Sequence, residues 1–393
     1  MRRVYLDHCA TTPLDERVLM AMMPYLTESY GNASSVHRFG QQARAAVDKA
    51  RRQVASLISA RANEIVFTSG GTEANNLAIR GICAAGAPHG RHLITSAIEH
   101  PSVRGPIGEL EKKGWEVSRL PVFEDGIVRV DDVREAIRPD TVLVSVMLAN
   151  NEIGTIQPVA EIGAVVRETN QRHLRFHVDA VQAAGRVPID VESIGCDLLT
   201  VSAHKLYGPK GMGTLFIRRG VRILPQQVGG HQERERRAGT ESVADIVGFG
   251  AAAELAKKER LDRHEHAQRL RDRFEKEVAE KIGDIVFNGK SDQRLSHISN
   301  ISFRFIEGEG LLIHLDLQGV AVSTGSACSS GTLEPSPVIR ALGRNEEVSR
   351  GAIRFSFGKD NSDEDIDYVL DVLPRAVESL RNLSPLNREP VAI

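Results

Sequence analysis

Two charged side chains in this 393-residue sequence directly follow stretches that are apolar enough to be buried strands. Lys205 follows 198-LLTVSAH, and Asp179 ends 174-LRFHVD. Burying a lysine or a carboxylate is costly without a partner, so both positions are unusual. A lysine amine can form a Schiff base with an aldehyde, and a buried carboxylate can keep a ring nitrogen protonated. The alternative for Lys205 is a surface lysine whose stem packs on apolar residues.

The stretch 70-GGTEANN has the composition of an anion-binding turn. It follows 64-EIVFTS and begins a helical pattern, so free backbone N–H groups and the helix dipole favour a phosphate there. The alternative is an ordinary Gly-Gly turn with Thr72 as the helix N-cap.

Two more polar loops follow predicted strands. His100 comes after 92-HLITSA, and Pro101 biases it toward an extended backbone, so it belongs to a loop rather than a helix face. Asn151 lies in a polar turn after 141-TVLVSVMLA, where its side chain can bind either backbone or a ligand. Alone, each residue is as consistent with turn structure as with function.

Together these residues indicate one cofactor. Ligands of open α/β sheets bind beyond the carboxyl ends of the strands, where all of these side chains are expected. The set contains a lysine flanked by Ser202 and His204, an acid, a histidine that can stack, and an anion cradle. Pyridoxal phosphate requires a Schiff-base lysine, an acid for its ring nitrogen and a phosphate site, so the sequence predicts this cofactor.

Cys328 lies in 322-VSTGSACSSGTLEP, among small residues only. A thiol on a mobile loop can travel between two sites, whereas the alternative is a small buried residue. The remaining cysteines (Cys9, Cys83 and Cys196) are interpreted as packing residues. No CxxC motif occurs, so a disulfide framework or a structural zinc site is not expected.

Strand-like runs alternate with amphipathic stretches as far as about Val243, which predicts an α/β domain with a mostly parallel mixed sheet. The remainder reads as a long charged helical region at 250–281, three further apolar segments and a closing helix from 363. We therefore expect a large cofactor-binding domain at 16–257. We expect a smaller α+β domain at 1–15 and 258–393, which carries a mobile cysteine loop at about 322–335.

Bulk composition excludes several classes of protein. Lys and Arg total 50 and Asp and Glu total 52, so a nucleic-acid role has no electrostatic support. No apolar run approaches the roughly 20 residues of a membrane helix. The N-terminus enters strand-like sequence at once, which predicts a cytoplasmic protein without a targeting peptide. Histidine spacing gives no metal motif, and no metal site is expected.

The motifs resemble a known family. Over nearly the whole chain the sequence is similar to the cysteine desulfurases of the NifS and IscS type. These belong to the class V aminotransferase group of fold-type I pyridoxal-phosphate enzymes. The resemblance rests on 5-YLDHCATTP, 67-FTSGGTEANN, 99-EHP, 149-ANNEIGTIQP, 177-HVDAVQAAG, 202-SAHKLYGPKGMG, 229-GGHQERERRAGT and 324-TGSACSSGTLEPS.

The resemblance implies a role for each candidate around the cofactor ring. Lys205 matches the Schiff-base lysine, and Asp179 matches the partner of the pyridinium nitrogen. Gln182 matches the residue that hydrogen-bonds the phenolic oxygen. His100 matches the residue that stacks on the ring and transfers protons.

The resemblance also implies the phosphate and substrate contacts. The phosphate would be held by Thr72, Ser202 and His204, with Gly71 leaving room, and by Thr240 of a second subunit. Asn151, beside the cofactor, and Arg354 match the residues that hold the substrate carboxylate.

The implied activity is conversion of L-cysteine to L-alanine with transfer of sulfur to Cys328 as a persulfide. A homodimer is implied, with an iron-sulfur scaffold protein or another sulfur acceptor as partner. The alternatives are a selenocysteine lyase, another class V aminotransferase-like enzyme, or a non-enzymatic sulfur carrier on the same fold. One departure is His8-Cys9, where the family usually has Asn-Asn or Tyr-Ser, which bears on substrate choice and redox sensitivity.

Overall fold

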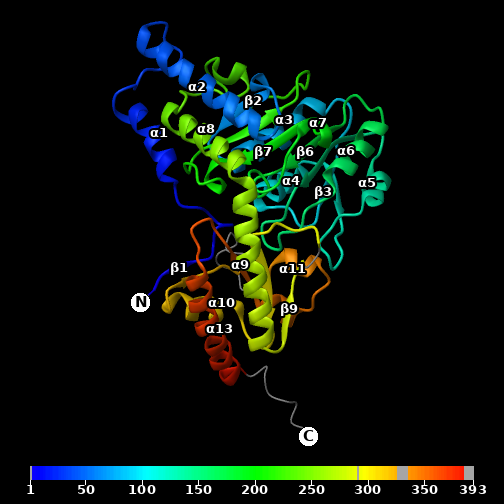
Figure 1. The fold of residues 1–393 in the computed structure, drawn as a ribbon. Helices are drawn as coiled ribbons and strands as arrows, with labels where there is room; N and C mark the ends of the chain where they lie inside the picture. The colour runs from blue at the N-terminus through cyan, green and yellow to red at the C-terminus, as the bar shows by residue number, and fades with distance from the viewer. Residues whose placement is uncertain (1, 290–291, 325–334, 385–393) are drawn as a thin grey trace.

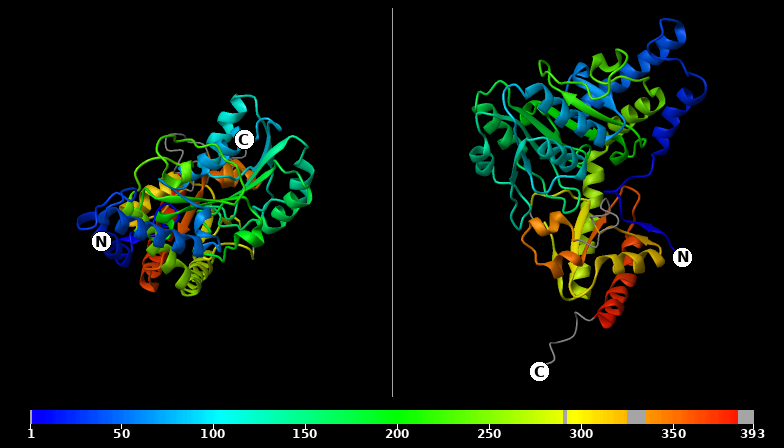
Figure 2. Two further views of the ribbon diagram at one scale, coloured as in Figure 1. Left: turned by 90° about the horizontal axis from the view of Figure 1, so that it is seen from above. Right: turned by 180° about the vertical axis from the view of Figure 1, so that it is seen from behind.

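The computed structural model describes residues 2–289, 292–324 and 335–384 of the chain (Figure 1). Cys328 and most of the predicted loop at 322–335 lie outside these residues. The described part has a large body built on a seven-stranded sheet and a smaller body below it (Figures 1 and 2).

The large sheet has the strand order β2-β8-β7-β6-β5-β3-β4. All neighbours are parallel except β8, which is antiparallel to both β2 and β7. The strands are β2 (Ile65–Thr68), β3 (His92–Ser96), β4 (Glu116–Leu120), β5 (Thr141–Met147), β6 (Arg175–Asp179), β7 (Leu198–Ser202) and β8 (Gly213–Ile217). This confirms the predicted α/β class and the mostly parallel mixed sheet.

Helices cover both faces of this sheet, which is why its strands are apolar on both sides. On one face Val66, Leu143 and Leu215 pack with α3 and α4 in one hydrophobic cluster. On the other face Ile65, Val144 and Phe216 pack with α2, α6 and α8 in a second cluster. The helices of this body are α1 (Glu16–Thr27), α2 (Arg38–Leu57), α3 (Gly71–Gly86), α4 (Pro101–Lys112), α5 (Val130–Ala136), α6 (Val159–Glu168), α7 (Val191–Ile194) and α8 (Val243–Lys258). Single 3₁₀ turns occur at η1 (Ala62–Glu64), η2 (Ala203–Lys205) and η3 (Gln232–Glu235).

The long helix α9 (Arg260–Lys281) leads into the smaller body (Figure 1). An antiparallel sheet β12-β10-β9 packs there with α9 and α13 around a separate apolar core. The N-terminal strand β1 (Val4–Tyr5) joins this body by pairing in parallel with β11. The other elements are β9 (Ile285–Phe287), β10 (Ile298–Phe303), α10 (Gly308–Leu317), β11 (Val320–Ala321), α11 (Pro337–Ala341), α12 (Glu346–Arg350), β12 (Ala352–Ser356) and α13 (Asp363–Leu383).

Two details of the fold differ from the sequence expectation. The helical region expected at 250–281 is two helices, α8 and α9, because Glu259 leaves helical geometry at φ −98° and ψ 10°. Strand β4 was not predicted, since its sequence EVSRL has no apolar run and it lies at the sheet edge. The domain boundaries at residues 15 and 257 stay a prediction, and the separate apolar core of the smaller body supports them.

A buried ion pair anchors the loop after β8 to the large body. Arg51 of α2 donates two hydrogen bonds to Glu233, at 2.6 and 2.7 Å, and both side chains are buried. Glu233 also accepts from the backbone N–H of Phe67 in β2 at 3.1 Å. Glu233 and the next two residues all have positive φ, between 46° and 63°, a strained conformation for side chains of this size. The ion pair therefore holds a strained turn in place.

We expect Glu233→Gln to lower the free energy of unfolding by about 3 kcal/mol, because it leaves the Arg51 charge buried without a counter-charge. Denaturant unfolding followed by circular dichroism measures the change. The control is Arg134→Met, which removes an ion pair with Glu168 that is exposed on both sides and should leave the unfolding midpoint unchanged. Equal losses in the two variants would contradict the buried pair's role.

Candidate active site

A cavity of about 300 Å³ lies beside the carboxyl ends of the parallel strands. The side chains that follow β2, β3, β5, β6 and β7 all reach it, as expected for an open α/β sheet. Ten of the predicted site residues line this cavity: Gly71, Thr72, His100, Asn151, Asp179, Gln182, Ser202, His204, Lys205 and Arg354.

Two predicted residues are not among the lining residues. Thr240 is exposed and lies in the segment after the strained turn at Glu233. The neighbouring Arg237 is bonded to Glu73 in the first turn of α3, with Nε 2.8 Å from Oε1. The loop is therefore tied to the same helix end that borders the cavity. Cys328 lies outside the described residues.

The N-terminus of α3 forms one end of the cavity. Its N-cap is Gly70, with φ +149°, and no side chain caps the helix. Thr72 lies in the first helical turn, so its alternative assignment as N-cap is wrong. The uncapped N–H groups and the helix dipole favour an anion at this position. A Cβ atom on Gly71 would lie 3.0 Å from Val181 Cγ2, so a larger side chain would crowd the cavity wall.

Asp179 is a buried carboxylate at the end of β6. Oδ2 accepts a hydrogen bond from Asn75 Nδ2 at 2.8 Å, and Oδ1 accepts one from the backbone N–H of Val181 at 3.0 Å. Asn75 also donates to Ser102 Oγ at 2.8 Å, and Ser102 Oγ lies 2.7 Å from His100 Nδ1. A continuous hydrogen-bonded chain therefore joins the carboxylate to the histidine.

Sequence reasoning missed Asn75 and Ser102. Asn75 lies between Ala74 and Leu77 on the buried face of α3, and a polar residue on such a face is a usable signal. Ser102 lies in the first turn of α4, two residues after His100, and a serine is common near the start of a helix. Its position therefore gave no sign of a role in the site.

The pKa values of both cavity histidines lie below the ordinary value, which favours neutral imidazoles at pH 7. His100 is the N-cap of α4, and burial together with the charges of Lys205 and Arg104 lowers its pKa. Burial, with the charges of Lys205 and Lys210, lowers the pKa of His204 to about 4. A neutral imidazole can accept a proton, which a charged one cannot.

Glu99 is a further buried acid behind His100 that sequence reasoning did not identify. Oε1 accepts hydrogen bonds from Ser96 Oγ at 2.5 Å and from the backbone N–H of Met147 at 2.9 Å. Burial raises its pKa to about 8, so the group is largely protonated at pH 7. It therefore adds little negative charge to the cavity.

Lys205 ends the single 3₁₀ turn η2 that directly follows β7. Its amine donates hydrogen bonds to the backbone carbonyls of Cys9 and Ala10, the latter at 2.7 Å. Gln182 Nε2 donates to the same Cys9 carbonyl at 3.0 Å. The N-terminal segment thus closes one side of the cavity.

Arg354 comes from β12 of the smaller body and reaches the same cavity. Nη2 donates to Asp7 Oδ1 at 2.7 Å, and Nη1 donates to the backbone carbonyl of Asn151 at 2.9 Å. Its Nε is buried without a hydrogen-bond acceptor among the described residues. A guanidinium group on the wall of a cavity is suited to binding a carboxylate.

Between residues 2 and 384, apart from the gaps, no group of three or more His, Cys, Asp or Glu side chains could hold a metal ion. Within the same ranges no helix is both long and apolar enough to cross a membrane.

Comparison with known proteins gives consistent matches along the chain. The family described as aminotransferase class V matches residues 4–369. A cysteine desulfurase IscS of Dictyoglomus turgidum is 50% identical, over 99% of this chain and 98% of its own. A cysteine desulfurase IscS of Methanosarcina thermophila is also 50% identical, over 98% of this chain and 94% of its own.

Solved structures agree with these sequence matches. A NifS-like protein superposes with a TM-score of 0.90 at 36% identity, covering 96% of this chain and all of that one. DndA from Streptomyces lividans superposes with a TM-score of 0.75 at 37% identity, covering 89% of this chain and 98% of that one. The chain therefore belongs to the class V aminotransferase family and, within it, to the cysteine desulfurases of the NifS and IscS type.

Proposed function

We propose that the protein converts L-cysteine to L-alanine and passes the sulfur to Cys328 as a persulfide. The reaction balances: the bond between Cβ and sulfur of cysteine breaks, and a bond forms between that sulfur and Cys328 Sγ. Of the two thiol protons, one ends on the methyl group of alanine and the other on the persulfide. The observation that carries the proposal is the meeting of Lys205, Asp179 and Arg354 in one cavity beside an uncapped helix end. The persulfide sulfur then goes to an acceptor for assembly of iron-sulfur clusters or other sulfur-containing cofactors.

Enzymes of this family use pyridoxal 5′-phosphate, and the cavity fits this cofactor. The uncapped start of α3 suits a phosphate. Gly71 leaves space for it, because a Cβ atom at this position would crowd Val181 on the cavity wall. A buried carboxylate, Asp179, and a lysine amine border the same space. When bound, the cofactor supplies an electron sink for the bonds around the substrate's α-carbon.

Residues around the cofactor have distinct roles in this proposal. Lys205 carries the cofactor and moves the substrate's α-proton on its Nζ. Asp179 keeps a proton on the ring nitrogen, which requires the carboxylate to remain charged, and Asn75 and Val181 stabilise that charge. Gln182 binds the phenolic oxygen, and His100 stacks on the ring and exchanges protons as a neutral imidazole.

The remaining contacts hold the two charged ends of the ligands. Thr72, Ser202 and His204 bind the phosphate together with the helix N-terminus, and all three line the cavity. Arg354 and Asn151, which both line the cavity, bind the substrate carboxylate. A carboxylate fixed at one end and an amine site at the other orient an α-amino acid for reaction.

A second copy of the chain completes the phosphate site, because Thr240 is exposed and does not line the cavity of its own chain. An apolar surface for such a partner is present on α1 and the start of α2. Its exposed members are Leu19, Met20, Met23, Leu26, Tyr30, Val36 and Phe39. Exposed apolar surface of this extent is typical of a subunit interface. The described cysteines are all free thiols, which supports a reducing cytoplasm as the compartment.

Two other activities remain as alternatives, a selenocysteine lyase and another class V aminotransferase-like reaction. A selenocysteine lyase would release alanine faster from selenocysteine than from cysteine. An aminotransferase-like enzyme would not need Cys328. The first alternative therefore differs from the proposal in its preferred substrate. The second differs in whether Cys328 is essential.

We expect cysteine-dependent release of alanine and of sulfide, the latter after a thiol reductant is added, from the wild-type protein. Lys205→Ala should abolish both products, and Cys328→Ala should reduce both by at least about 100-fold, since each removes a reacting group. Amino-acid analysis and a sulfide assay measure the products. Alanine formation that survives Cys328→Ala would favour the aminotransferase alternative, and equal activity in all three proteins would overturn the mechanism.

We expect Gly71→Ala to weaken pyridoxal phosphate binding by about tenfold, because the new methyl group crowds Val181 beside the phosphate site. Titration of cofactor-free protein, followed by visible absorbance, measures the dissociation constant. Gly105→Ala is the matched control, since a Cβ atom there meets no atom within 4 Å. Unchanged binding in Gly71→Ala would place the phosphate elsewhere.

We expect Met20→Glu to convert the dimer to monomers, because Met20 is a 69% exposed member of the α1 surface and a glutamate there would place a charge between the two copies. Sedimentation velocity measures the change. The control is Ile313→Glu on α10, which introduces the same charge at a site 53% exposed and away from α1. Dimers that persist in Met20→Glu would exclude α1 from the interface.

A further inference from the structure

The N-terminal strap, defined here as residues 9–15, runs alongside the lysine turn, defined here as residues 203–207, which carries Lys205. Cys9 and Ala10 accept hydrogen bonds from the Lys205 amine through their carbonyls. Thr11 Oγ1 lies 3.1 Å from His204 Nδ1. Five of the seven strap residues therefore contact this turn, once Thr12 and Asp15 are included.

Thr12 joins the strap to the turn on both sides of Lys205. Its hydroxyl donates to the His204 carbonyl at 2.8 Å and accepts from the Tyr207 N–H at 2.9 Å. The side chain is buried, so water cannot replace either bond. One hydroxyl thus fixes the backbone just before and just after the lysine.

Tyr207 locks the turn from the other end. It is a buried residue with φ +64°, a conformation that costs a bulky side chain of the order of 1–3 kcal/mol unless its surroundings impose it. Its carbonyl accepts from the Asp15 N–H at 3.0 Å, and its Oη accepts from the Lys359 N–H at 2.7 Å. Both ends of the tyrosine are therefore bonded to segments far away in the sequence.

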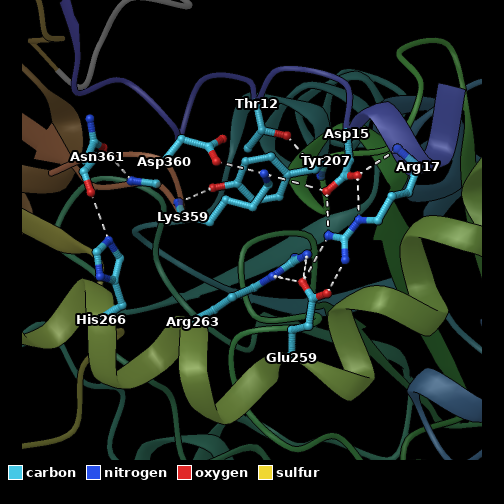
Figure 3. Close-up of polar contacts among 11 residues, drawn as sticks. Thr12, Asp15, Arg17, Tyr207, Glu259, Arg263, His266, Lys359, Asp360 and Asn361 are labelled. Atoms are coloured by element: carbon cyan, nitrogen blue, oxygen red, sulfur yellow. Dashed lines mark hydrogen bonds and ion pairs between the residues drawn. The ribbon is translucent and has the colours of Figure 1, made fainter.

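Charged side chains surround the Tyr207 ring (Figure 3). The cations of Arg263 and Lys359 lie 5.1 and 5.2 Å from the ring centroid, within the range of cation–π attraction. Acidic partners offset the repulsion between these cations: Glu259 pairs with Arg263 at 2.7 Å, and Asp15 lies 3.6 Å from Lys359. The cluster ties the strap, α9 and the segment after β12 to the lysine turn.

The proposed reaction makes a specific demand on Lys205, and the inference rests on that proposal. Lys205 would hold the cofactor through its Nζ when no substrate is present, and the substrate's amine would take the place of Nζ until alanine leaves. During that interval the Lys205 amine would not be covalently held. It must nevertheless stay near the α-carbon to move a proton and to re-form its bond.

We propose that the strap carbonyls of Cys9 and Ala10 are the holding site for the released Lys205 amine, and that Thr12 and Tyr207 are positioning residues that keep this site in register with the turn. Carbonyl oxygens suit this task because they accept hydrogen bonds from an ammonium group without competing for its covalent chemistry. The site uses backbone atoms, so the identity of residue 9, a cysteine here, is not what provides it.

Competitive acetylation of the cofactor-free full-length chain tests the holding site. Acetic anhydride reacts with neutral, accessible amines, and mass spectrometry gives the labelling of Lys205 relative to the exposed Lys210 in the same molecule. Thr12→Val keeps the shape of the side chain and removes the hydroxyl. We expect it to raise this ratio about fivefold, as for loss of one hydrogen bond, whereas Thr12→Ser keeps the hydroxyl and should stay within about twofold of wild type.

A purely structural role of Thr12 would change the folded fraction without changing this ratio in folded molecules. Equal ratios in wild type, Thr12→Val and Thr12→Ser would overturn the proposal. If Thr12→Val does not fold, Tyr207→Phe takes its place, because it keeps the ring and loses only the bond from Lys359; an unchanged ratio there overturns the proposal equally. The labelling uses neither the substrate cysteine nor the cofactor. A result against the holding site is therefore distinct from a result against the proposed cysteine desulfurase activity.

Discussion

The buried charge of Asp179 is the constraint on which the site depends. A carboxylate at the end of a central strand is stable only if other groups replace the water it has lost. Asn75 and the Val181 N–H supply two hydrogen bonds: Asn75 comes from α3, which contacts β6, and Val181 lies two residues beyond the end of β6. The same helix α3 directs its uncapped N-terminus into the cavity. The second turn of α3 therefore donates a hydrogen bond to the Asp179 carboxylate, and its first turn provides an anion site.

Positions of the strands and of the residues after them could be predicted from the sequence. Lys205, Asp179 and His100 each follow an apolar run, and the carboxyl ends of parallel strands lie along one edge. Periodicity also gave the closing helix correctly, because 363–383 has a serine N-cap and a regular apolar face. These features depend on local sequence and on one general rule of sheet topology.

Features that depend on contacts between distant segments could not be predicted. Asn75 reads as a helix residue until β6 places Asp179 beside it, and nothing near Thr12 in the sequence indicates that it bonds both sides of a lysine some 190 positions later. The break at Glu259 is another case, because its residue type is compatible with a continuous helix. Its carboxylate is used instead to pair with Arg17 and Arg263 at the junction of the two bodies (Figure 3).

In the proposed reaction Lys205 must reach the substrate's α-carbon while Arg354 binds its carboxylate, so these two side chains need a fixed separation. They come from different bodies, since Lys205 follows β7 of the large sheet and Arg354 lies in β12 of the small one. Residues 7–15 span the two: Asp7 binds Arg354, Cys9 donates its N–H to Ser356 Oγ at 2.9 Å, and the strap continues along the lysine turn. A shift of one body against the other would have to break this short covalent span or the bonds at one of its ends. The N-terminal segment therefore bonds to both Arg354 and Lys205 and links the two bodies at the cavity, a task that neither sheet can perform alone.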